Sequence, residues 1–250
     1  MIKIDKLKEY FKRDGYIFIP GFLNETEVKQ IEDKIKEYII HVVPKMSSSH
    51  VFYEDKSDKN SLKQLQDLQI YDPFFSEILY NSRFEEIAKM LLEVKVIGKT
   101  IEYFNKPPKI GKPTPPHQDG YYFNLKPPQA ITMWMALENV DLENGCLRYI
   151  PGSHLTGMRQ HGRSQTIGFS QGITDYNDQD RMNEEVFPVK PGDLLIHHSL
   201  TIHRADGNKS NTRSRKAIGL IYFDHAAKED IRTKEAYQKM LKAGPAELEN

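Results

Sequence analysis

A short segment near the middle of the chain carries two side chains that could bind one metal ion. The run Pro115-Pro116-His117-Gln118-Asp119-Gly120 is expected to be extended. In an extended segment, residues two apart project to the same face, so His117 and Asp119 can offer a nitrogen and a carboxylate oxygen to one ion. The tripeptide also recurs by chance, and a polar turn is the competing interpretation.

His203 is the best candidate for a third ligand among the nine histidines. It follows a turn over 190–193 and a strand predicted over 193–198. Two histidines and one carboxylate form a facial triad, which covers one face of an octahedral Fe(II) ion and leaves the other face open for a cosubstrate and O₂. The pattern predicts a non-haem iron centre.

An arginine cluster downstream of His203 could hold the cosubstrate. Arg213-Ser214-Arg215 stands at the head of a strand predicted over 216–223. A 2-oxoglutarate site needs a cation for the distal carboxylate, and a guanidinium can grip a carboxylate with two parallel hydrogen bonds. Arg213 and Arg215 have the same strand parity, so both remain candidates.

The order of the motifs resembles that of the phytanoyl-CoA dioxygenase family of iron(II)- and 2-oxoglutarate-dependent oxygenases. The matching motifs extend over most of the chain. They are Asp14-Gly15-Tyr16, Pro20-Gly21-Phe22, Lys63 ahead of Asp72-Pro73, Asn105-Lys106-Pro107-Pro108, His117-Gln118-Asp119, Trp134-Met135-Ala136-Leu137, Glu143-Asn144-Gly145-Cys146-Leu147, Ile150-Pro151-Gly152-Ser153-His154, Pro191-Gly192-Asp193, and His203 with Asn208, Ser210 and Arg215.

The resemblance implies that His117, Asp119 and His203 hold the iron and that an arginine grips 2-oxoglutarate. The family usually places this arginine one residue earlier relative to the histidine, where Ser214 stands here. We assign the role to Arg215, because 213–217 resembles the family's Arg-Ser-Arg-x-Ala run, with Arg213 as the alternative. Ala217 and Gly219 share the Arg215 face and are expected to leave space for the cosubstrate. Further cosubstrate contacts are implied for Trp134, Gln118 and Lys63.

The resemblance also implies the reaction. The protein is expected to hydroxylate a small organic metabolite, polar or anionic, with Fe(II), 2-oxoglutarate and O₂, and to release succinate and CO₂. Related halogenases carry a small residue at the carboxylate position, so Asp119 favours hydroxylation. Two alternatives are a cupin-like metalloenzyme that does not use 2-oxoglutarate, which would lack the strand arginine, and a catalytically silent ligand sensor, which would have a broken triad.

The elements expected around these residues indicate one domain over 1–250. Residues 1–94 read as mostly helical, and Asn24 with Glu27 forms a capping-box pattern ahead of a helix over 25–40. The region 44–60 is polar and predicted to be a loop. A core of short strands is expected over 95–225, followed by a helical tail over 226–250.

The fold class expected is mainly β with flanking helices, a double-stranded β-helix or jelly roll. Along 131–137, apolar residues alternate with Thr132, Trp134 and Ala136, as in a strand with two different faces. His197 and His198 alternate in another strand, so one of them can approach the site while the other faces solvent.

The segment 153–185 is polar and too long for an ordinary connection, which favours a lid over the open iron face. We expect it to be mobile without substrate and to contact the substrate. Arg159, His161 and Arg163 are the candidates for pairing with a substrate anion.

Bulk composition restricts the remaining possibilities. Lys+Arg 35 against Asp+Glu 35 gives zero formal net charge, which argues against a general nucleic-acid binder. The single cysteine, Cys146, cannot form an intrachain disulfide. With no signal peptide or membrane span expected, a cytoplasmic location follows. The oligomeric state is not readable from the sequence.

Overall fold

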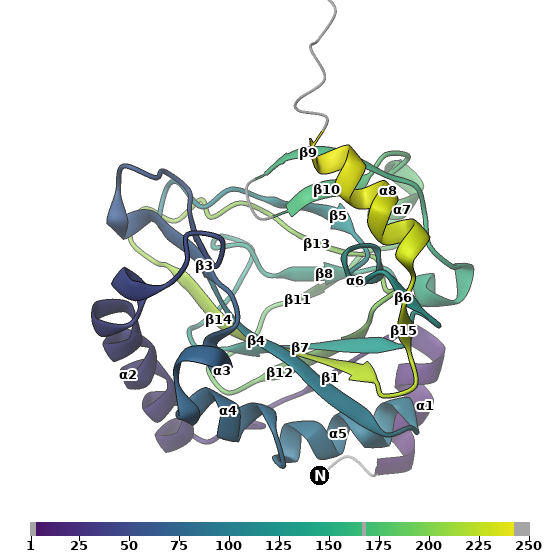
Figure 1. Ribbon diagram of the computed structural model, residues 1–250, viewed down its shortest axis with the longest axis horizontal. Helices are drawn as coiled ribbons and strands as arrows, with labels where there is room; N and C mark the ends of the chain where they lie inside the picture. The colour runs from purple at the N-terminus through teal and green to yellow at the C-terminus, as the bar shows by residue number, and fades with distance from the viewer. Residues whose placement is uncertain (1–3, 167–168, 243–250) are drawn as a thin grey trace, which may run out of the picture.

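Two antiparallel sheets face each other in the computed structural model, which describes residues 4–166 and 169–242 (Figure 1). The large sheet has the order β1 (Tyr16–Ile19), β12 (Leu194–His198), β7 (Ala130–Ala136), β14 (Arg215–Asp224), β4 (Val96–Lys106), β3 (Leu62–Leu65), β2 (Val51–Tyr53). The small sheet has the order β11 (Glu185–Phe187), β8 (Leu147–Tyr149), β13 (His203–Ala205), β5 (Thr114–His117). This is the jelly-roll architecture that the sequence predicts.

Helices from the first part of the chain cover the outer face of the large sheet (Figure 1). They are α1 (Ile4–Asp14), α2 (Glu25–His41), α3 (Leu68–Tyr71), α4 (Pro73–Leu79) and α5 (Arg83–Leu92). The same part of the chain also contributes β1, β2 and β3 to the large sheet, where β1 pairs with β12 and β3 pairs with β4. The described residues 4–94 therefore form part of the core and are not merely attached to its surface.

The helix α2 forms as its sequence pattern predicts. The Asn24 side chain accepts a hydrogen bond from the Glu27 backbone, and the Glu27 side chain accepts one from the Asn24 backbone. This capping box stabilises the first turn by about 1 kcal/mol. The helix ends at His41, one residue beyond the predicted end.

The two faces of β7 belong to different parts of the core. Met133 and Met135 pack in the large apolar cluster beneath the helices, whereas Trp134 and Ala136 pack in the cluster between the sheets. Every residue of β7 is buried, because helices cover one face of the sheet and the small sheet covers the other. The predicted two-faced strand is confirmed, and its inner face supplies part of the pocket described below.

Segments expected to be loops contain short regular elements. The region 44–60 includes β2 and parts of two 3₁₀ turns (Val43–Lys45 and Lys59–Ser61). The segment 153–185 contains the elements η3 (Ser153–Thr156), β9 (His161–Thr166), β10 (Phe169–Ile173) and α7 (Asp178–Met182). Strands β9 and β10 pair antiparallel, and β10 packs against β5. The hairpin was not predicted because its strands are polar and rich in Gly and Gln, without the apolar alternation that indicates a strand.

The remaining elements lie near the open end of the jelly roll (Figure 1). They are α6 (Gly120–Phe123), β6 (Leu125–Lys126), β15 (Lys228–Glu229) and α8 (Ile231–Lys242). The predicted helical tail corresponds to α8, and residues 243–250 lie outside the described part of the chain. Within the described ranges, no helix combines the length and the apolar character that crossing a membrane requires.

Candidate active site

Two neighbouring strands of the small sheet bring the predicted metal ligands together. His117 ends β5 and His203 begins β13, and these two residues are direct partners in the register. Asp119 follows β5 at the start of α6. Its Oδ1 atom lies 3.3 Å from His117 Nε2 and 3.6 Å from His203 Nε2. The ligand atoms of all three residues lie within 4.8 Å of one another.

Backbone carbonyl groups orient both imidazoles. His117 Nδ1 is 2.8 Å from Pro115 O, and His203 Nδ1 is 3.0 Å from Thr201 O. A proton on each Nδ1 satisfies these carbonyls and leaves the Nε2 lone pairs directed at the shared site. Both side chains are buried. The arrangement therefore presents two preoriented nitrogen donors beside one carboxylate.

The charge states suit a cation. Burial, reinforced by His117 and His197, lowers the pKa of His203 well below its ordinary value. Burial alone would raise the pKa of Asp119, but the surrounding histidines outweigh it and hold that pKa well below its ordinary value. The site at neutral pH thus contains an ionised carboxylate and a neutral imidazole, which are the forms that bind divalent metal ions.

The second oxygen of Asp119 has its own partners within the protein. Asp119 Oδ2 lies 2.5 Å from Thr132 Oγ1 and 3.0 Å from His197 Nε2. Of the two alternating histidines, His197 therefore approaches the site. His198 lies on the other face of β12, partly buried against Phe11 rather than facing solvent. Thr132 was missed as a site residue, although its strand parity with Trp134 could have indicated it.

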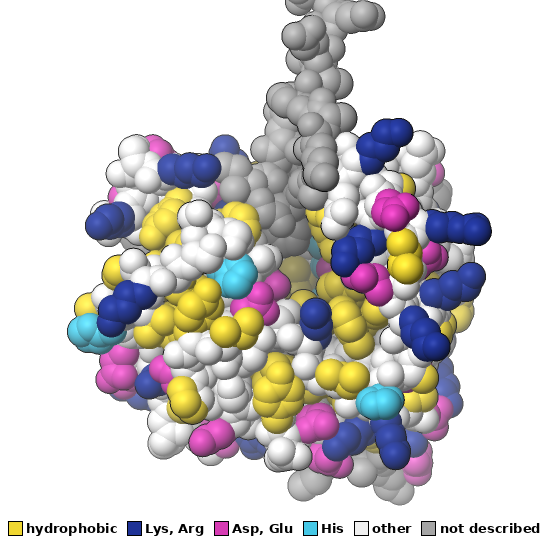
Figure 2. Space-filling model, viewed as in Figure 1, with side chains coloured by type: hydrophobic (Ala, Val, Ile, Leu, Met, Phe, Trp, Pro, Cys, Tyr) yellow, Lys and Arg dark blue, Asp and Glu magenta, His cyan; other side chains and the backbone are white. Residues whose placement is uncertain are grey.

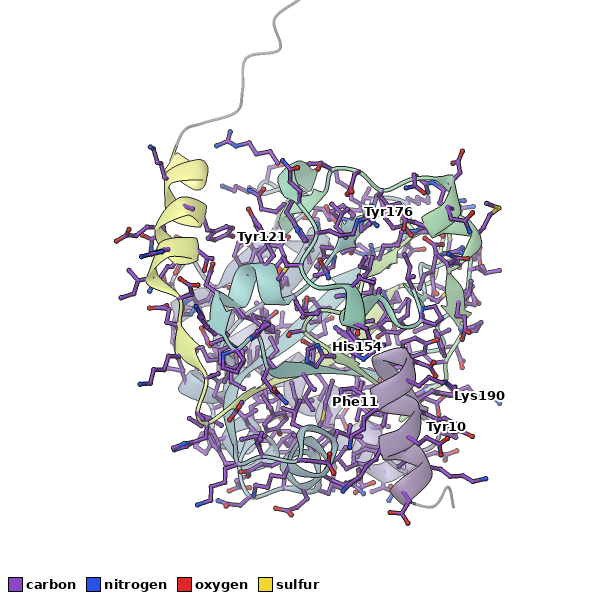
Figure 3. The ribbon with its side chains drawn as sticks, turned by 90° about the vertical axis from the view of Figure 1, so that its right-hand side faces the viewer. Tyr10, Phe11, Tyr121, His154, Tyr176 and Lys190 are labelled. Carbon is purple, nitrogen blue, oxygen red and sulfur yellow. The ribbon has the colours of Figure 1, made fainter. Side chains whose placement is uncertain are left out.

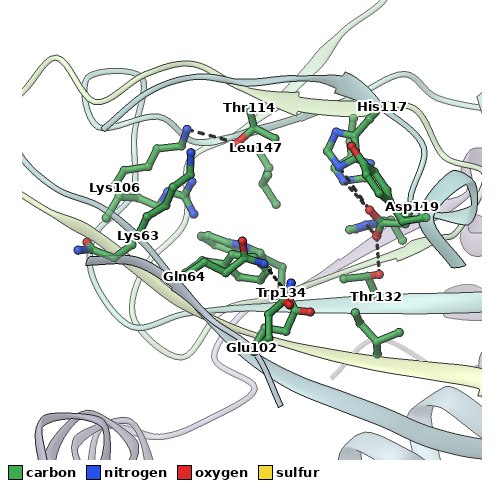
Figure 4. Close-up of a pocket in the computed structure, with 18 of the residues that line it drawn as sticks. Lys63, Gln64, Glu102, Lys106, Thr114, His117, Asp119, Thr132, Trp134 and Leu147 are labelled. Atoms are coloured by element: carbon green, nitrogen blue, oxygen red, sulfur yellow. Dashed lines mark hydrogen bonds and ion pairs between the residues drawn. The ribbon is translucent and has the colours of Figure 1, made fainter. Parts of the chain in front are cut away.

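A pocket extends from the triad between the two sheets (Figure 4). It is lined by Lys63, Gln64, Gln66, Glu102, Phe104, Asn105, Lys106, Thr114, His117, Asp119, Tyr122, Phe123, Thr132, Trp134, Leu147, His197, His203, Arg215 and Ile221. In Figure 2 the surface is hollowed between the regions of β3 and α8, and hydrophobic side chains gather around the hollow. Tyr237 of α8 packs against Tyr121 and against Tyr122, which lines the pocket.

Arg215 reaches the end of the pocket away from the triad. It is 4% exposed, and its guanidinium carbon lies 5.2 Å from the centroid of the Trp134 ring. Its Nε atom has no hydrogen-bond partner, and burial lowers its pKa to about 10. Arg213 instead lies at the surface, where it pairs with Asp141 (2.8 Å) and Glu143. The structure thus places Arg215 in the pocket and Arg213 outside it.

Two lysines make this end of the pocket strongly basic. Lys63 is buried, and its Nζ atom lies 3.4 Å from Glu54 Oε1 but forms no hydrogen bond. Lys106 pairs with Arg215 in the strand register and donates to Thr114 Oγ1 at 3.3 Å. Burial lowers the pKa of both lysines. Sequence reasoning predicted Lys63 and missed Lys106, which stood in a matched motif without an assigned role.

Gln118, for which the sequence predicts a cosubstrate contact, is not among the residues that line the pocket. Its Nε2 donates to Gly157 O at 2.9 Å and to Leu200 O at 2.7 Å, and its Oε1 accepts from Arg159 N at 2.8 Å. Because Gln118 lies between two residues that face the site, the extended backbone turns it to the other side. Its amide ties η3 and the β12–β13 turn to the metal-binding segment.

The space expected above Ala217 and Gly219 is filled by an aromatic ring. A Cβ atom at Gly219 would lie 2.7 Å from Phe104 Cε2. The small residues of β14 therefore accommodate Phe104, which itself lines the pocket, and do not line it themselves.

The candidate lid residues are largely engaged within the protein. Arg159 pairs with Asp175 and Asp180, each at 2.9 Å. His161 accepts a hydrogen bond from Gln118 N at 3.1 Å, and burial lowers its pKa to about 4. His161 is thus neutral at physiological pH, and Arg159 already has carboxylate partners. Arg163 is the exposed member of the three.

The residues present fit both groups that the motifs imply. Two imidazole nitrogens and one carboxylate oxygen, buried and close together, match the donor set of a facial iron site. A buried guanidinium with an unpartnered nitrogen matches the distal carboxylate of 2-oxoglutarate. One pocket contains both features.

Solved structures share this fold. An epimerase, SnoN, in complex with Fe³⁺, alpha-ketoglutarate and nogalamycin RO has a TM-score of 0.76 and 23% identity, with 94% of this chain and 88% of that chain covered. EctD from S. alaskensis with bound Fe has a TM-score of 0.71 and 18% identity, with coverages of 89% and 76%. The chain therefore has the same fold as these two proteins.

Sequence comparison assigns the family. The phytanoyl-CoA dioxygenase (PhyH) model matches residues 11–217. Phytanoyl-CoA dioxygenase of Arabidopsis thaliana is 29% identical over 246 residues, covering 85% of this chain and 86% of the relative. Phytanoyl-CoA dioxygenase domain-containing protein 1 of Bos taurus is 26% identical over 250 residues, covering 83% of this chain and 85% of the relative. The chain belongs to the phytanoyl-CoA dioxygenase family of iron- and 2-oxoglutarate-dependent oxygenases.

Proposed function

We propose that this protein is an Fe(II)- and 2-oxoglutarate-dependent hydroxylase of a small organic metabolite. The observation that carries the proposal is the single pocket that joins His117, Asp119 and His203 to Arg215. In this proposal the first three residues hold iron, and Arg215 holds the distal carboxylate of 2-oxoglutarate. Trp134 supports the guanidinium through its ring face, and Lys63 adds positive charge.

Iron and 2-oxoglutarate, when bound, supply O₂-dependent oxidation of the substrate, with 2-oxoglutarate converted to succinate and CO₂. The protein's own contribution is binding, orientation and exclusion of water. Phe104, Phe123 and Ile221 make much of the pocket wall apolar. Asp119 keeps its carboxylate in the position that halogenases of related sequence leave vacant, which supports hydroxylation.

The two competing functions are less consistent with these side chains. A cupin-like enzyme without 2-oxoglutarate has no need of a buried cation across the pocket, yet Arg215 occupies that place. A silent sensor has no need of an intact triad, and all three ligand types converge here. Hydroxylation by iron and 2-oxoglutarate accounts for both features together.

The substrate is proposed to be a small molecule, as the pocket between the two sheets supports. The structure gives less support to an anionic substrate, because Arg159 is paired and His161 is neutral. The basic end of the pocket suits the cosubstrate, whereas the wall near Glu102 and Tyr122 combines a carboxyl group with aromatic surface. We retain a polar substrate, and a cytoplasmic location for the enzyme, as parts of this proposal.

The test is a turnover assay on the purified chain with Fe(II), 2-oxoglutarate, O₂ and a panel of small metabolites. Succinate should form in proportion to O₂ consumed, and the product should gain one oxygen atom. The Asp119→Ala/His203→Ala double variant is the matched control. Succinate formation that is equal in the control, or absent with every metabolite and also without substrate, would contradict the proposal. If the product gains no oxygen atom, the proposed cofactors stand and the reaction is an oxidation other than hydroxylation.

A further inference from the structure

His197 contacts Asp119 but stands outside the ligand set. It lies on β12, is 2% exposed, and places Nε2 3.0 Å from Asp119 Oδ2. The group of ligand atoms that lie within 4.8 Å of one another comprises His117, Asp119 and His203, without His197. His197 thus touches the ligand set at two places, by a hydrogen bond to Asp119 and by its ring, whose centroid lies 4.2 Å from that of His203.

The direction of the hydrogen bonds around His197 follows from the donors available. An ionised carboxylate only accepts hydrogen bonds, so His197 Nε2 must carry a proton toward Asp119. The other ring nitrogen, Nδ1, lies 3.0 Å from the hydroxyl of Tyr149, within hydrogen-bond distance. Tyr149 is fully buried and stacks on Tyr16, with ring centroids 4.8 Å apart. The buried phenol thus fixes the orientation of the imidazole, with Nε2 directed at Asp119.

The two oxygens of Asp119 consequently have different surroundings. Oδ2 accepts from Thr132 Oγ1 (2.5 Å) and from His197 Nε2 (3.0 Å). Oδ1 faces His117 Nε2 and His203 Nε2. Both donors to Oδ2 come from the large sheet, whereas the two metal-binding imidazoles come from the small sheet. The carboxylate is held across the interior of the jelly roll by one oxygen and offered to the metal by the other.

We propose that His197, oriented by Tyr149, is a positioning residue that keeps Asp119 a single-oxygen metal ligand. The proposal rests on the metal site of the proposed function. A carboxylate that binds through both oxygens would occupy one more coordination position, and the site needs its open positions for cosubstrate and O₂. His197 and Thr132 prevent this by retaining Oδ2.

The neighbouring His198 offers a matched control. It is adjacent in sequence and on the same strand, but its ring lies on the opposite face of the large sheet. There the ring centroid is 6.3 Å from Phe11 and 5.7 Å from His154. Figure 3 shows these two residues at the α1 side of the molecule. A substitution of His198 tests for general damage to β12 without touching Asp119.

The experiment is a titration of the metal-stripped full chain with Co(II) alone. Co(II) replaces Fe(II) in sites of this kind, and its visible absorption weakens as its coordination number rises. The variants are His197→Leu, His197→Gln and His198→Leu, with His117→Leu as the reference for a lost ligand. Affinity is followed by calorimetry, and thermal unfolding confirms that each variant is folded.

We expect His197→Leu to bind Co(II) roughly 10- to 100-fold more weakly than the natural chain, as for other partners of metal ligands. Its absorption should also weaken, because the freed Oδ2 can join the metal. His197→Gln should recover most of the affinity and the spectrum, since its amide can still donate to Oδ2. His198→Leu should lower thermal stability while leaving affinity and spectrum unchanged.

Several results would overturn the proposal. Affinity and spectrum unchanged in His197→Leu would show that the contact has no effect on the metal. A loss as complete as in His117→Leu would make His197 a ligand itself, and equal losses in His197→Leu and His198→Leu would indicate damage to β12. Failure of the natural chain to bind Co(II) would reject the metal site and this proposal with it, and is thereby distinguishable from a failure of the positioning role alone.

Discussion

The two ends of the pocket differ in how many of their buried charged groups have hydrogen-bond or ion-pair partners within the protein. At the triad end, Asp119 is the centre of a closed arrangement, with Thr132 and His197 on one oxygen and the two ligand histidines near the other. At the basic end, Arg215, Lys63 and Lys106 lie close together. Arg215 Nε has no hydrogen-bond partner, and Lys63 Nζ faces the Glu54 carboxylate at 3.4 Å without a hydrogen bond.

This difference separates a preorganised site from an incomplete one. Desolvating a cation costs free energy unless an anion or hydrogen bonds compensate it. The lowered pKa of Arg215, about 10, reflects a burial that nearby groups do not offset. The triad end is built before a metal ion arrives, whereas the basic end becomes electrostatically balanced only when an anion binds. Substitutions at the two ends should therefore affect different measurements.

Loss of a triad ligand should have the largest effect. Replacing Asp119, His117 or His203 by Ala removes one of three donors, and even outer partners of metal ligands contribute 10- to 100-fold. We expect metal affinity to fall by more than roughly a hundredfold and succinate formation to fall to background, with the fold retained. Calorimetric metal titration measures the affinity, a succinate assay measures turnover, and circular dichroism checks that the fold is retained. Normal turnover in the Asp119→Ala/His203→Ala double variant would reject the assignment.

The second prediction concerns the basic end. Arg215→Leu removes a charged bidentate partner worth about 2–3 kcal/mol, so the dissociation constant for 2-oxoglutarate should rise roughly 30- to 150-fold. Metal affinity in the absence of 2-oxoglutarate should change little, because Arg215 does not touch the triad. Arg213→Leu is the matched control and should alter neither quantity. The reverse result, with Arg213→Leu impairing 2-oxoglutarate binding, would transfer the role to Arg213.

A smaller effect is expected from the segment that adjoins the triad end. Arg159→Gln removes ion pairs with Asp175 and Asp180. Partly exposed pairs contribute about 0.2–1 kcal/mol, so substrate-coupled turnover should fall by no more than about fivefold while slow uncoupled 2-oxoglutarate decarboxylation persists. Both rates can be read as succinate formed with and without substrate. If Arg163→Gln alone raises the KM for substrate, Arg163 is the substrate contact and Arg159 is structural.

The smallest predicted effect is a pH dependence of stability from Glu102. Burial raises the pKa of Glu102 to about 8, against the opposing effect of the hydrogen bond that Gln64 donates to the carboxylate at 2.9 Å. The folded protein therefore keeps a proton that the unfolded chain loses near 4.5. Stability from this group is full below about 4.5 and is lost as the pH rises to about 8.

Glu102→Gln should remove this slope. Thermal unfolding of the natural chain and the variant at a series of pH values provides the measurement. The stability of the variant, relative to that of the natural chain, should be higher at pH 8 than at pH 4.5. Because Glu102 is partly exposed, the difference should be smaller than for a fully buried group. If the stabilities of the two proteins change with pH in the same way, folding does not raise the pKa of Glu102.

The site was predictable where local pattern and motif order agreed. His117 and Asp119 were found from their spacing, and Arg215 was favoured over Arg213 because of the run that follows it. The direction of the Gln118 side chain could not be read from the sequence, because it depends on hydrogen bonds to η3 and the β12–β13 turn, both distant in sequence. Lys106 and Thr132 were missed because an isolated Lys or Thr on a strand has no chemical meaning until its neighbours are known.

The sequence by itself determined which elements form and which residue types are available. The apolar period of α2, its capping box and the alternation of β7 are local properties, and they are present in the chain as read. Only the tertiary structure decided which oxygen of Asp119 is held and which is offered, because Thr132 and His197 reach it from strands of the opposite sheet. The distribution of paired and unpaired charges along the pocket was likewise decided there, because it depends on contacts between residues far apart in sequence, such as Lys63 and Glu54 beside Arg215.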